Sequence, residues 1–296
     1  MEVFMKKHIG MLCMAALAGS ALLFGCRTAS KPAADKGILV VSFGTSYNSS
    51  RSVTIGAIES TIREQFPDYQ VLRAFTADTI ISILKKRDNV TVDTVTQALD
   101  RAASSGIKTL IVQPTHLMNG FEYTDLAEDL KKYEKKFDRL VLSTPLLTSD
   151  DDYKQVAAII GAKAASYDDG STAVCFMGHG TEAESNSTYA RLQTVMESEG
   201  YKNCYIGTVE AEPSVDDLLR VIKQQGRYTQ VVLMPLMVVA GDHANNDMAG
   251  DEDDSWKSIF ENAGFAVTCV LEGLGQNYDI QRMYAAHARS AAESLR

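Results

Sequence analysis

The sequence has little positive charge. Lysine and arginine total 29 residues against 38 aspartate and glutamate residues, so the formal net charge is −9. The one lysine-rich stretch, 129–139, interleaves acidic residues and is typical of a solvated helix face. Proteins that bind nucleic acid present a basic patch or stripe. The composition therefore argues against nucleic acid as a partner.

Cysteine is scarce, and its placement argues against two kinds of site. Of five cysteines, Cys13 and Cys26 lie near the N-terminus. The other three lie far apart, in apolar stretches: Cys175, Cys204 and Cys269. An odd number without a C-x-x-C pair argues against a disulfide framework and against a thiolate metal site. We expect these three to be buried thiols.

Several motifs of cofactor enzymes are missing as well. The chain has no G-x-S-x-G elbow, no G-x-G-x-x-G turn and no Walker loop, so we expect neither that class of hydrolase nor a nucleotide. The acidic stretch 250–256 lacks the spacing of an EF-hand. It is typical of a solvated helix start leading to Trp256.

The N-terminus has the pattern of an export signal. Lys6 and Lys7 precede an apolar run that is too short for a comfortable membrane span. The run ends in "LLFGC", which resembles a bacterial lipobox with Cys26 as the acylated residue. We therefore predict a lipoprotein-type signal peptide over 1–25, a polar tether over 26–36 and a periplasmic protein on a lipid anchor. An ordinary secretory signal with a chance cysteine is the alternative.

The rest of the chain has an internal repeat. "GILVVSFGTS" (37–46) parallels "STAVCFMGHGT" (171–181), and each half continues with helix and strand patterns in the same order. In each half one buried strand contains a proline, Pro114 or Pro235. Strands alternating with helices of this length imply parallel sheets covered on both faces. We predict two α/β halves, 37–168 and 169–296, flanking a cleft that is lined by the loops after the strands.

Three strand ends of the second half carry residues suited to a metal. His179 and His243 each follow a buried strand and a glycine, and Glu210 ends the strand between them. Carboxyl ends of neighbouring parallel strands lie side by side, where open α/β sheets place their ligands. Two imidazoles and a carboxylate suit cobalt, nickel, iron or zinc. The alternatives are histidines satisfied by local hydrogen bonds, and Glu212 in the place of Glu210.

The first half lacks such a set. Alignment of the two prolines puts Glu122 opposite His243, and the stretch 43–45 opposite the His179 turn. We predict that ligand-contacting residues of this half are Ser42, Phe43, Gly44, Thr45, His116 and Glu122. Structural hydrogen bonding is the alternative for His116 and Glu122. His287, in a terminal helix, is predicted to lie at the surface.

At these residues the chain resembles the anaerobic cobalt chelatases of cobalamin biosynthesis, the CbiK type. The resemblance begins near residue 37, continues to the end of the chain and includes "GILVVSFGTS", "QPTHLMNGFEY", "MGHGTEAESNSTY", "IGTVEAEPSVDDLL" and "VVLMPLMVVAGDHANNDMAGDEDDSW". It implies the ferrochelatase-like fold, two α/β halves related by a pseudo-twofold axis. It also implies that His179, Glu210 and His243 are the metal-binding and catalytic residues.

The resemblance implies ATP-independent insertion of cobalt(II) into sirohydrochlorin. Since cobalamin is not expected to be made outside the inner membrane, iron(II) or nickel(II) stays open as the substrate metal. A lipid-anchored protein that carries metal, tetrapyrrole or haem is the second hypothesis. A carboxylate-rich substrate needs local positive charge, for which Arg51, Arg73 and Arg191 are the candidates. The oligomeric state, a homo-oligomer included, stays open.

Overall fold

The computed structural model describes residues 35–295. The predicted signal peptide, Cys26 and nearly all of the predicted tether lie outside these residues. Within the described range, no helix combines the length and the apolar character needed to cross a membrane.

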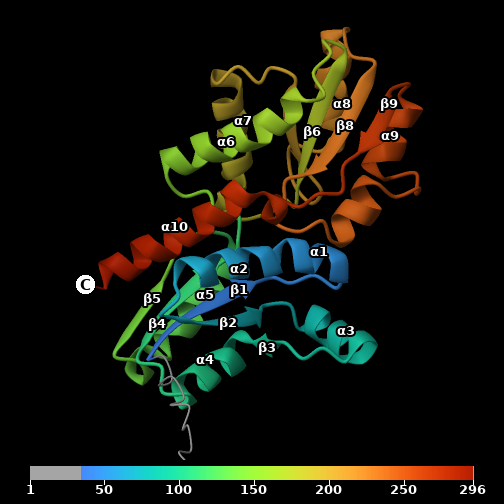
Figure 1. The fold of residues 1–296 in the computed structure, drawn as a ribbon. Helices are drawn as coiled ribbons and strands as arrows, with labels where there is room; N and C mark the ends of the chain where they lie inside the picture. The colour runs from blue at the N-terminus through green and yellow to red at the C-terminus, as the bar shows by residue number, and fades with distance from the viewer. Residues whose placement is uncertain (1–34, 296) are drawn as a thin grey trace, which may run out of the picture. The chain divides into compact units, whose positions relative to one another are not determined.

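The first half of the described chain forms a five-stranded sheet in the order β3-β2-β1-β4-β5 (Figure 1). All its strand pairs are parallel. The strands are β1 (Lys36–Ser42), β2 (Gln70–Phe75), β3 (Asp93–Thr94), β4 (Thr109–Pro114) and β5 (Arg139–Leu142). The helices are α1 (Asn48–Val53), α2 (Ile55–Gln65), α3 (Asp78–Asp88), α4 (Val95–Ser104), α5 (Phe121–Lys131) and η1 (Glu134–Lys136).

The second half forms a four-stranded parallel sheet in the order β7-β6-β8-β9. Its strands are β6 (Thr172–Gly178), β7 (Cys204–Thr208), β8 (Gln230–Pro235) and β9 (Ala266–Cys269). The longer helices are α6 (Asp150–Ala165), α7 (Ser187–Ser198), α8 (Val215–Gln225), α9 (Trp256–Asn262) and α10 (Tyr278–Ser294). The short helices are η2 (Glu184–Asn186), η3 (Ala244–Met248) and η4 (Leu274–Gln276).

The register of the strands confirms the internal repeat. Pro114 pairs with Val41, next to the last residue of β1, and Pro235 pairs with Met177, next to the last residue of β6. Strands β2-β1-β4-β5 therefore correspond to β7-β6-β8-β9, and β3 has no counterpart in the second sheet. Equivalent loops of the two halves can be compared residue by residue from this register.

Local sequence explains why these elements form. The central strands β1 and β6 are nearly continuous apolar runs that are buried on both faces, as parallel strands require. Helix α8 begins at a capping box in which Ser214 and Asp217 satisfy each other's backbone N–H groups. Its buried residues, Leu218 and Ile222, lie four apart and so occupy one face of the helix.

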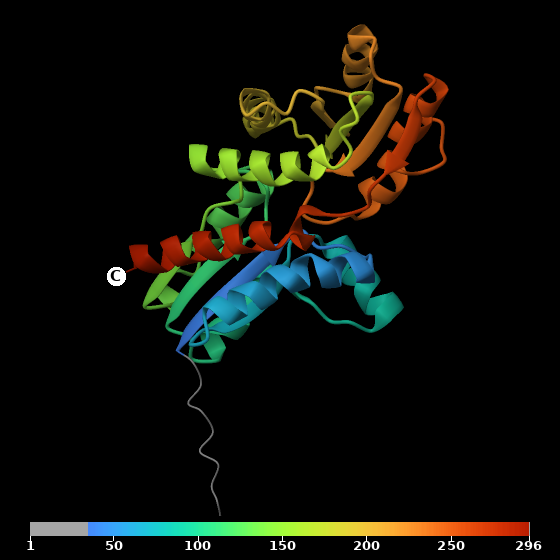
Figure 2. The same ribbon diagram turned by 45° about the horizontal axis from the view of Figure 1, so that its top comes forward.

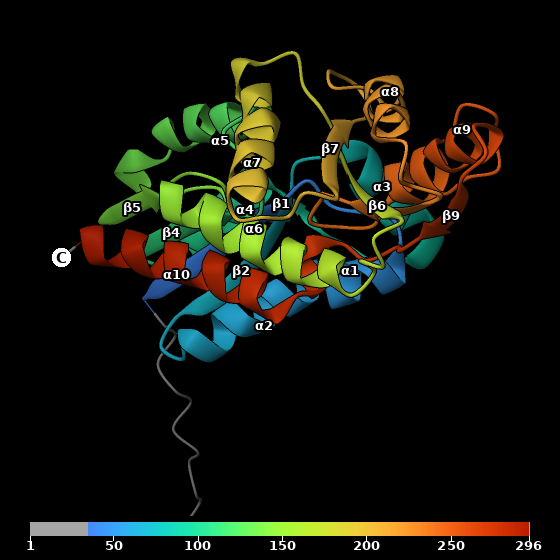
Figure 3. The same cartoon turned by 90° about the horizontal axis from the view of Figure 1, so that it is seen from above.

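Two helices do not follow the division into halves. The strands separate as predicted around residue 168, but α6 packs against α7 while α10 packs against α2 and β4 of the first sheet. Figure 2 shows α6 and α10 running side by side, and Figure 3 shows α7 beside α6. One apolar cluster includes both Ile38 of the first sheet and Val174 of the second, together with Tyr284 of α10. The boundary predicted at 168/169 therefore separates the strands but cuts through a shared core.

The three cysteines of the described chain are free, as predicted. Cys175 and Cys204 are buried, and Cys269 is partly buried. Burial raises the pKa of all three thiols, and that of Cys204 rises to about 12. A thiol with a raised pKa is inert at neutral pH, which fits a packing role.

Candidate metal centre

Three strand ends of the second sheet bring His179, Glu210 and His243 together. One potential ligand atom from each residue lies within 4.8 Å of the others, and we call this group the triad. The two imidazole rings are edge to face, with centroids 4.7 Å apart. The residues lie far apart in the sequence but meet because β7, β6 and β8 are neighbours and all end at the same edge.

The turn after β6 fixes the orientation of His179. Gly180 has a φ of +88°, and a Cβ at this position would lie 2.8 Å from the backbone nitrogen of Ala211, so the turn needs glycine. Nδ1 of His179 lies 2.8 Å from the carbonyl oxygen of Gly180. Since a carbonyl only accepts, Nδ1 is the donor of this hydrogen bond, which leaves Nε2 as the nitrogen available to a metal.

The extension of the β6–β7 ladder beyond the strands places Glu210 beside His179. The backbone N–H of Val209 donates to the carbonyl of Gly178 at 3.0 Å, and that of Glu210 donates to the carbonyl of His179 at 2.9 Å. The Glu210 carboxylate lies 3.6 Å from Nδ1 of His179.

His243 is oriented by a carboxylate one helical turn away. It lies at the start of η3, and its Nδ1 donates to Asp247 at 2.8 Å. Such a carboxylate fixes the tautomer and the ring orientation of a metal-binding histidine. The lone pair of Nε2 is therefore free in His243, as it is in His179.

The triad is open to solvent. The side chains of His179, Glu210 and His243 are 48%, 55% and 31% exposed, so an ion held there keeps coordination positions for another ligand. Open positions distinguish a reactive metal site from a structural one. Glu212, the alternative to Glu210, instead has its carboxylate on the backbone N–H of Ser214, at the start of α8.

The first half carries different residues at the equivalent positions. By register, Phe43 corresponds to His179, Ala77 to Glu210 and Glu122 to His243. The backbone repeats too, because the N–H of Ala77 donates to the carbonyl of Phe43 at 3.3 Å, just as Glu210 donates to His179. Two of the three ligand-type side chains are thus replaced, and within residues 35–295 a group of this composition is found in the second half alone.

Glu122 and His116 form a pair in the first half. Glu122 lies 3.5 Å from Nε2 of His116, and neither ring nitrogen of His116 has a hydrogen-bond partner among the described residues. Burial lowers the pKa of His116 to about 4, so this imidazole is neutral at physiological pH. Burial raises the pKa of Glu122, and the nearby His179 opposes that rise. Glu122 is therefore close enough to His179 for the two charges to interact, and its contact with a ligand stays a prediction.

The structure gives most of the predicted 42–45 stretch a structural role. The Ser42 hydroxyl accepts a hydrogen bond from Thr115 at 2.8 Å, and Thr45 accepts one from the backbone of Tyr47. Both side chains are buried, so a ligand cannot reach them in this conformation. Gly44 has a φ of +103°, with Phe75 packed where its side chain would stand. Only Phe43, which is 50% exposed, presents its side chain.

Sequence reasoning missed one exposed aromatic residue. Phe121 begins α5, next to Glu122, and is the most exposed large hydrophobic side chain of the described chain at 62%. Both Phe43 and Phe121 follow adjacent strands of the first sheet, since β1 pairs with β4. The signal that could have identified Phe121 is an aromatic residue at a helix start, directly beside a candidate carboxylate.

The three predicted arginines differ in their partners. Arg73 makes two bonds of 2.6 Å to the buried Glu59, and Arg191 pairs with Asp150. Arg51 donates to the carbonyl of Thr45 at 3.3 Å and has no carboxylate partner within residues 35–295. Arg51 is therefore the arginine of the three that can receive a substrate carboxylate without breaking an ion pair.

One prediction about the remaining histidines is wrong. His287 does not lie at the surface, because its side chain is only 13% exposed and its Nε2 lies 2.9 Å from Asp152 of α6.

The acidic stretch before Trp256 does form a helix start, where Ser255 caps α9 and Asp251 pairs with Lys257. A separate cavity of about 460 Å³ lies between α6 and residues 270–278, and no residue of the triad lines it.

Comparison with known proteins places the chain in a family. A family model described as cobalt chelatase (CbiK) matches residues 36–293. The sirohydrochlorin cobaltochelatase of Salmonella typhimurium is 40% identical over 256 residues, which cover 86% of this chain and 96% of that protein. The sirohydrochlorin cobaltochelatase CbiKC of Nitratidesulfovibrio vulgaris is 32% identical over 266 residues, 89% of this chain and 93% of that protein.

Solved structures agree on the fold. The Bacillus subtilis protein SirB with Fe3+ has a TM-score of 0.62 at 11% identity, covering 88% of this chain and 96% of that one. A second SirB structure, in complex with cobalt, has a TM-score of 0.61 at 12% identity, with the same coverage. The predicted chelatase fold is therefore confirmed. The chain belongs to the cobalt chelatase family of the CbiK type.

Proposed function

We propose that this protein inserts cobalt(II) into sirohydrochlorin without ATP, using the triad as the metal site. The observation that carries the proposal is the convergence of His179, Glu210 and His243 within 4.8 Å, with Nε2 free in each imidazole. The names of the two relatives supply the substrate, and the donor set supplies the chemistry. Imidazole and carboxylate ligands suit a borderline divalent ion such as cobalt(II).

In the first step the triad binds the hydrated ion and replaces part of its water. Glu210 offsets one of the two positive charges, and the two imidazoles donate lone pairs without adding charge. Because the triad is half-exposed, the remaining coordination positions face outward, where pyrrole nitrogens can displace water. The hydrogen bond between Asp247 and Nδ1 of His243 leaves Nε2 as the nitrogen that would bind the ion.

In the second step the macrocycle must lose two pyrrole protons as it takes up the ion. Glu122 is suited to accept one of them, because its raised pKa makes it a stronger base than a solvated carboxylate. It belongs to the half opposite the triad, so metal and proton acceptor contact the macrocycle from different sides. Glu210 or solvent accepts the other proton once the metal has left.

The first half also offers surfaces that suit the substrate itself. Phe121, next to Glu122, and Phe43, after the adjacent strand, present exposed aromatic side chains, and a flat macrocycle packs well against such rings. Arg51 offers an unpaired guanidinium beside Thr45 for one peripheral carboxylate. Positive charge at this one place suits an anionic substrate, although the chain as a whole is acidic.

Iron(II) is the second substrate metal that we propose to test, since the same three ligand types also suit it. We also propose that the protein is exported and held by a lipid on Cys26, on the basis of the "LLFGC" pattern. Radiolabelled palmitate should label the wild type and not a Cys26→Ser variant. Labelling of neither would leave an ordinary secretory signal.

The test of the function is anaerobic turnover. Purified protein is mixed with excess sirohydrochlorin and either cobalt(II) or iron(II), and the visible spectrum of the macrocycle is followed. We expect many equivalents of metallated product, lost in His179→Ala and in His243→Ala. Product that stops at one equivalent would contradict an enzyme and support the carrier on the same fold.

A further inference from the structure

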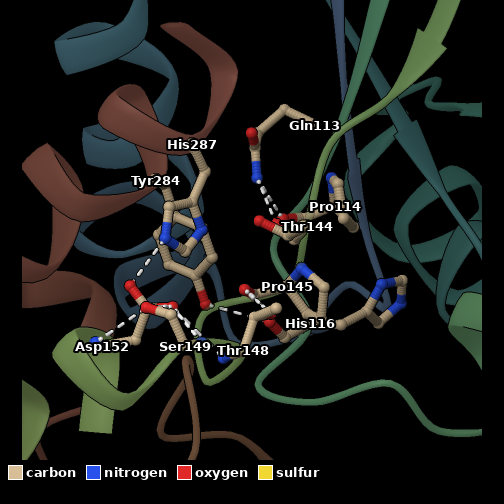
Figure 4. Close-up of polar contacts among 10 residues, drawn as sticks. All are labelled: Gln113, Pro114, His116, Thr144, Pro145, Thr148, Ser149, Asp152, Tyr284 and His287. Atoms are coloured by element: carbon tan, nitrogen blue, oxygen red, sulfur yellow. Dashed lines mark hydrogen bonds and ion pairs between the residues drawn. The ribbon is translucent and has the colours of Figure 1, made fainter. Parts of the chain in front are cut away.

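A buried polar network joins α10 to the loop that carries Glu122. Figure 4 shows its members, which come from α6, α10, the end of β4 and the segment after β5. The polar contacts that matter are made by Asp152, His287 and Tyr284. None of the three belongs to the triad.

The first member is the Asp152–His287 pair. Asp152 is 6% exposed, and one of its carboxylate oxygens accepts from Nε2 of His287 at 2.9 Å. The other oxygen accepts from the backbone N–H of Ser149 at 2.7 Å and from that of Thr148 at 3.3 Å. Burial opposes ionisation of Asp152, but the hydrogen bonds from Ser149 and His287 outweigh it and lower its pKa. The ionised carboxylate thereby ties α10 to the segment that precedes α6.

The segment before α6 is in turn hydrogen-bonded to the loop that precedes Glu122. The backbone N–H of Leu146 donates to the carbonyl of His116 at 3.0 Å, and that of Leu147 donates to the carbonyl of Leu117 at 2.8 Å. These are hydrogen bonds between main chains, so the two segments move together. Asp152 and His287 are therefore connected to His116 through hydrogen bonds to its main chain and its neighbours.

The second member, Tyr284, reaches the same loop directly. Its side chain is fully buried, and its hydroxyl donates to the carbonyl of Thr115 at 2.9 Å, with that of His116 3.4 Å away. Both routes from α10 therefore end at residues 115–117. Six residues after His116, Glu122 lies in the first turn of α5 and contacts the His116 ring.

A requirement for stability alone does not explain why these buried side chains are polar. An apolar residue of similar volume would pack as well, and burying a hydroxyl and a His–Asp pair costs free energy unless every group is bonded. Here the Tyr284 hydroxyl is directed at the carbonyls of one loop and Nε2 of His287 at Asp152, while Nδ1 of His287 is buried without a partner among the described residues. Catalytic groups must be held within about 0.5 Å of their working geometry, and main-chain anchors of this kind supply such control.

We propose that Tyr284 and the Asp152–His287 pair are positioning residues that set the place of Glu122 relative to the triad. The proposal rests on the proposed function, in which Glu122 accepts a proton. It assigns to α10, a helix that follows the second sheet in the chain, control over the proton acceptor of the first half.

The test begins with Tyr284→Phe, which removes the hydroxyl and keeps the ring. We expect kcat to fall by about 10-fold or more, since small misplacements of reacting groups have effects of that size. Cobalt(II) affinity at the triad, measured by titration without the macrocycle, should change less than about twofold. The matched control is Tyr278→Phe on the same helix, whose side chain is 59% exposed and should tolerate the change.

A double-mutant cycle with Glu122→Gln identifies the route. If Tyr284 acts through Glu122, then Tyr284→Phe should lower kcat no further in the Glu122→Gln background. A multiplicative loss in that background, or a parallel loss of cobalt(II) affinity, would overturn the proposal. So would an unchanged kcat in folded Tyr284→Phe.

A second variant covers the case in which Tyr284→Phe does not fold. In His287→Gln, kcat should fall while cobalt(II) affinity stays as in the wild type. The control is Asp150→Asn, whose side chain is exposed. An equal loss of kcat in both variants would overturn the proposal. Failure of the proposed function looks different. In that case Glu122→Gln itself leaves turnover unchanged, or the wild type does not turn over.

Discussion

At the residue scale, metal binding by the triad depends on which ring nitrogens of its two histidines are free of hydrogen bonds. Hydrogen bonds to the carbonyl of Gly180 and to Asp247 fix Nδ1 of the two histidines, so Nε2 is available in both. The same comparison explains the asymmetry of the molecule. Where the second half has His179 and His243, the first half has Phe43 and Glu122. One half is suited to metal, and the other to the macrocycle and its protons.

The first prediction concerns Asp247. Asp247→Asn should weaken cobalt(II) binding by about 10- to 100-fold, because carboxylates behind a histidine ligand contribute that much to metal affinity. Isothermal titration with cobalt(II) measures it. Asp251→Asn is the control, since Asp251 pairs with Lys257 and is 93% exposed. Equal affinities in the two variants would contradict the role given to Asp247.

The second prediction concerns Glu122. Glu122→Gln should lower turnover by about 10²- to 10⁴-fold, the usual contribution of a general base. Cobalt(II) binding should stay as in the wild type, because the triad is intact. Turnover kinetics and metal titration of the same preparation measure the two quantities. A variant that loses metal binding instead would place Glu122 among the ligands.

The third prediction follows from the low pKa of His116. Its folded-state pKa of about 4 lies below the ordinary 6.5, so the unfolded chain binds a proton there that the folded protein does not. The neutral form therefore contributes stability above pH 6.5, and this contribution is lost as the pH falls from 6.5 toward 4. The loss is on the order of 3 kcal/mol for a shift of this size.

Urea unfolding at several pH values measures this effect. His116→Gln should flatten the pH dependence of the free energy of unfolding between pH 6.5 and 4. An unchanged slope in that variant would show that His116 titrates normally.

At the scale of elements, the sequence predicted the two sheets but not which helices pack against each of them. The alternation of strands and helices indicated two parallel sheets, and the prolines of β4 and β8 gave the correct alignment of the halves. The two-residue strand β3 was not predicted, because so short a stretch has no period of its own. The triad was predicted because each of its members follows a strand and lies beside a turn.

The packing of α6 on the second half and of α10 on the first half could not be predicted from the pattern. An amphipathic helix shows that it has an apolar face but not which sheet that face covers, so α6 and α10 gave no sign of their packing. His287 was placed at the surface for the same reason. Its partner Asp152 is 135 positions away in the sequence, and no local feature links them.

At the scale of the whole molecule, the shared core should make unfolding cooperative. Residues of both sheets and of α10 contribute to one apolar cluster, in addition to the cluster that each half has of its own. We predict a single transition in urea for the described part of the chain. The one tryptophan, Trp256, is buried in the second half and reports on that half alone. Its fluorescence should therefore change together with far-UV circular dichroism, and two separate midpoints would indicate independent halves.

Cobalt(II) is expected to be held by the triad and passed from there to the macrocycle. Anomalous diffraction at the cobalt edge, from crystals grown anaerobically with cobalt(II), tests it most directly. We predict a peak bonded to Nε2 of His179, Nε2 of His243 and the Glu210 carboxylate. A peak between His116 and Glu122, with none at the triad, would contradict the account.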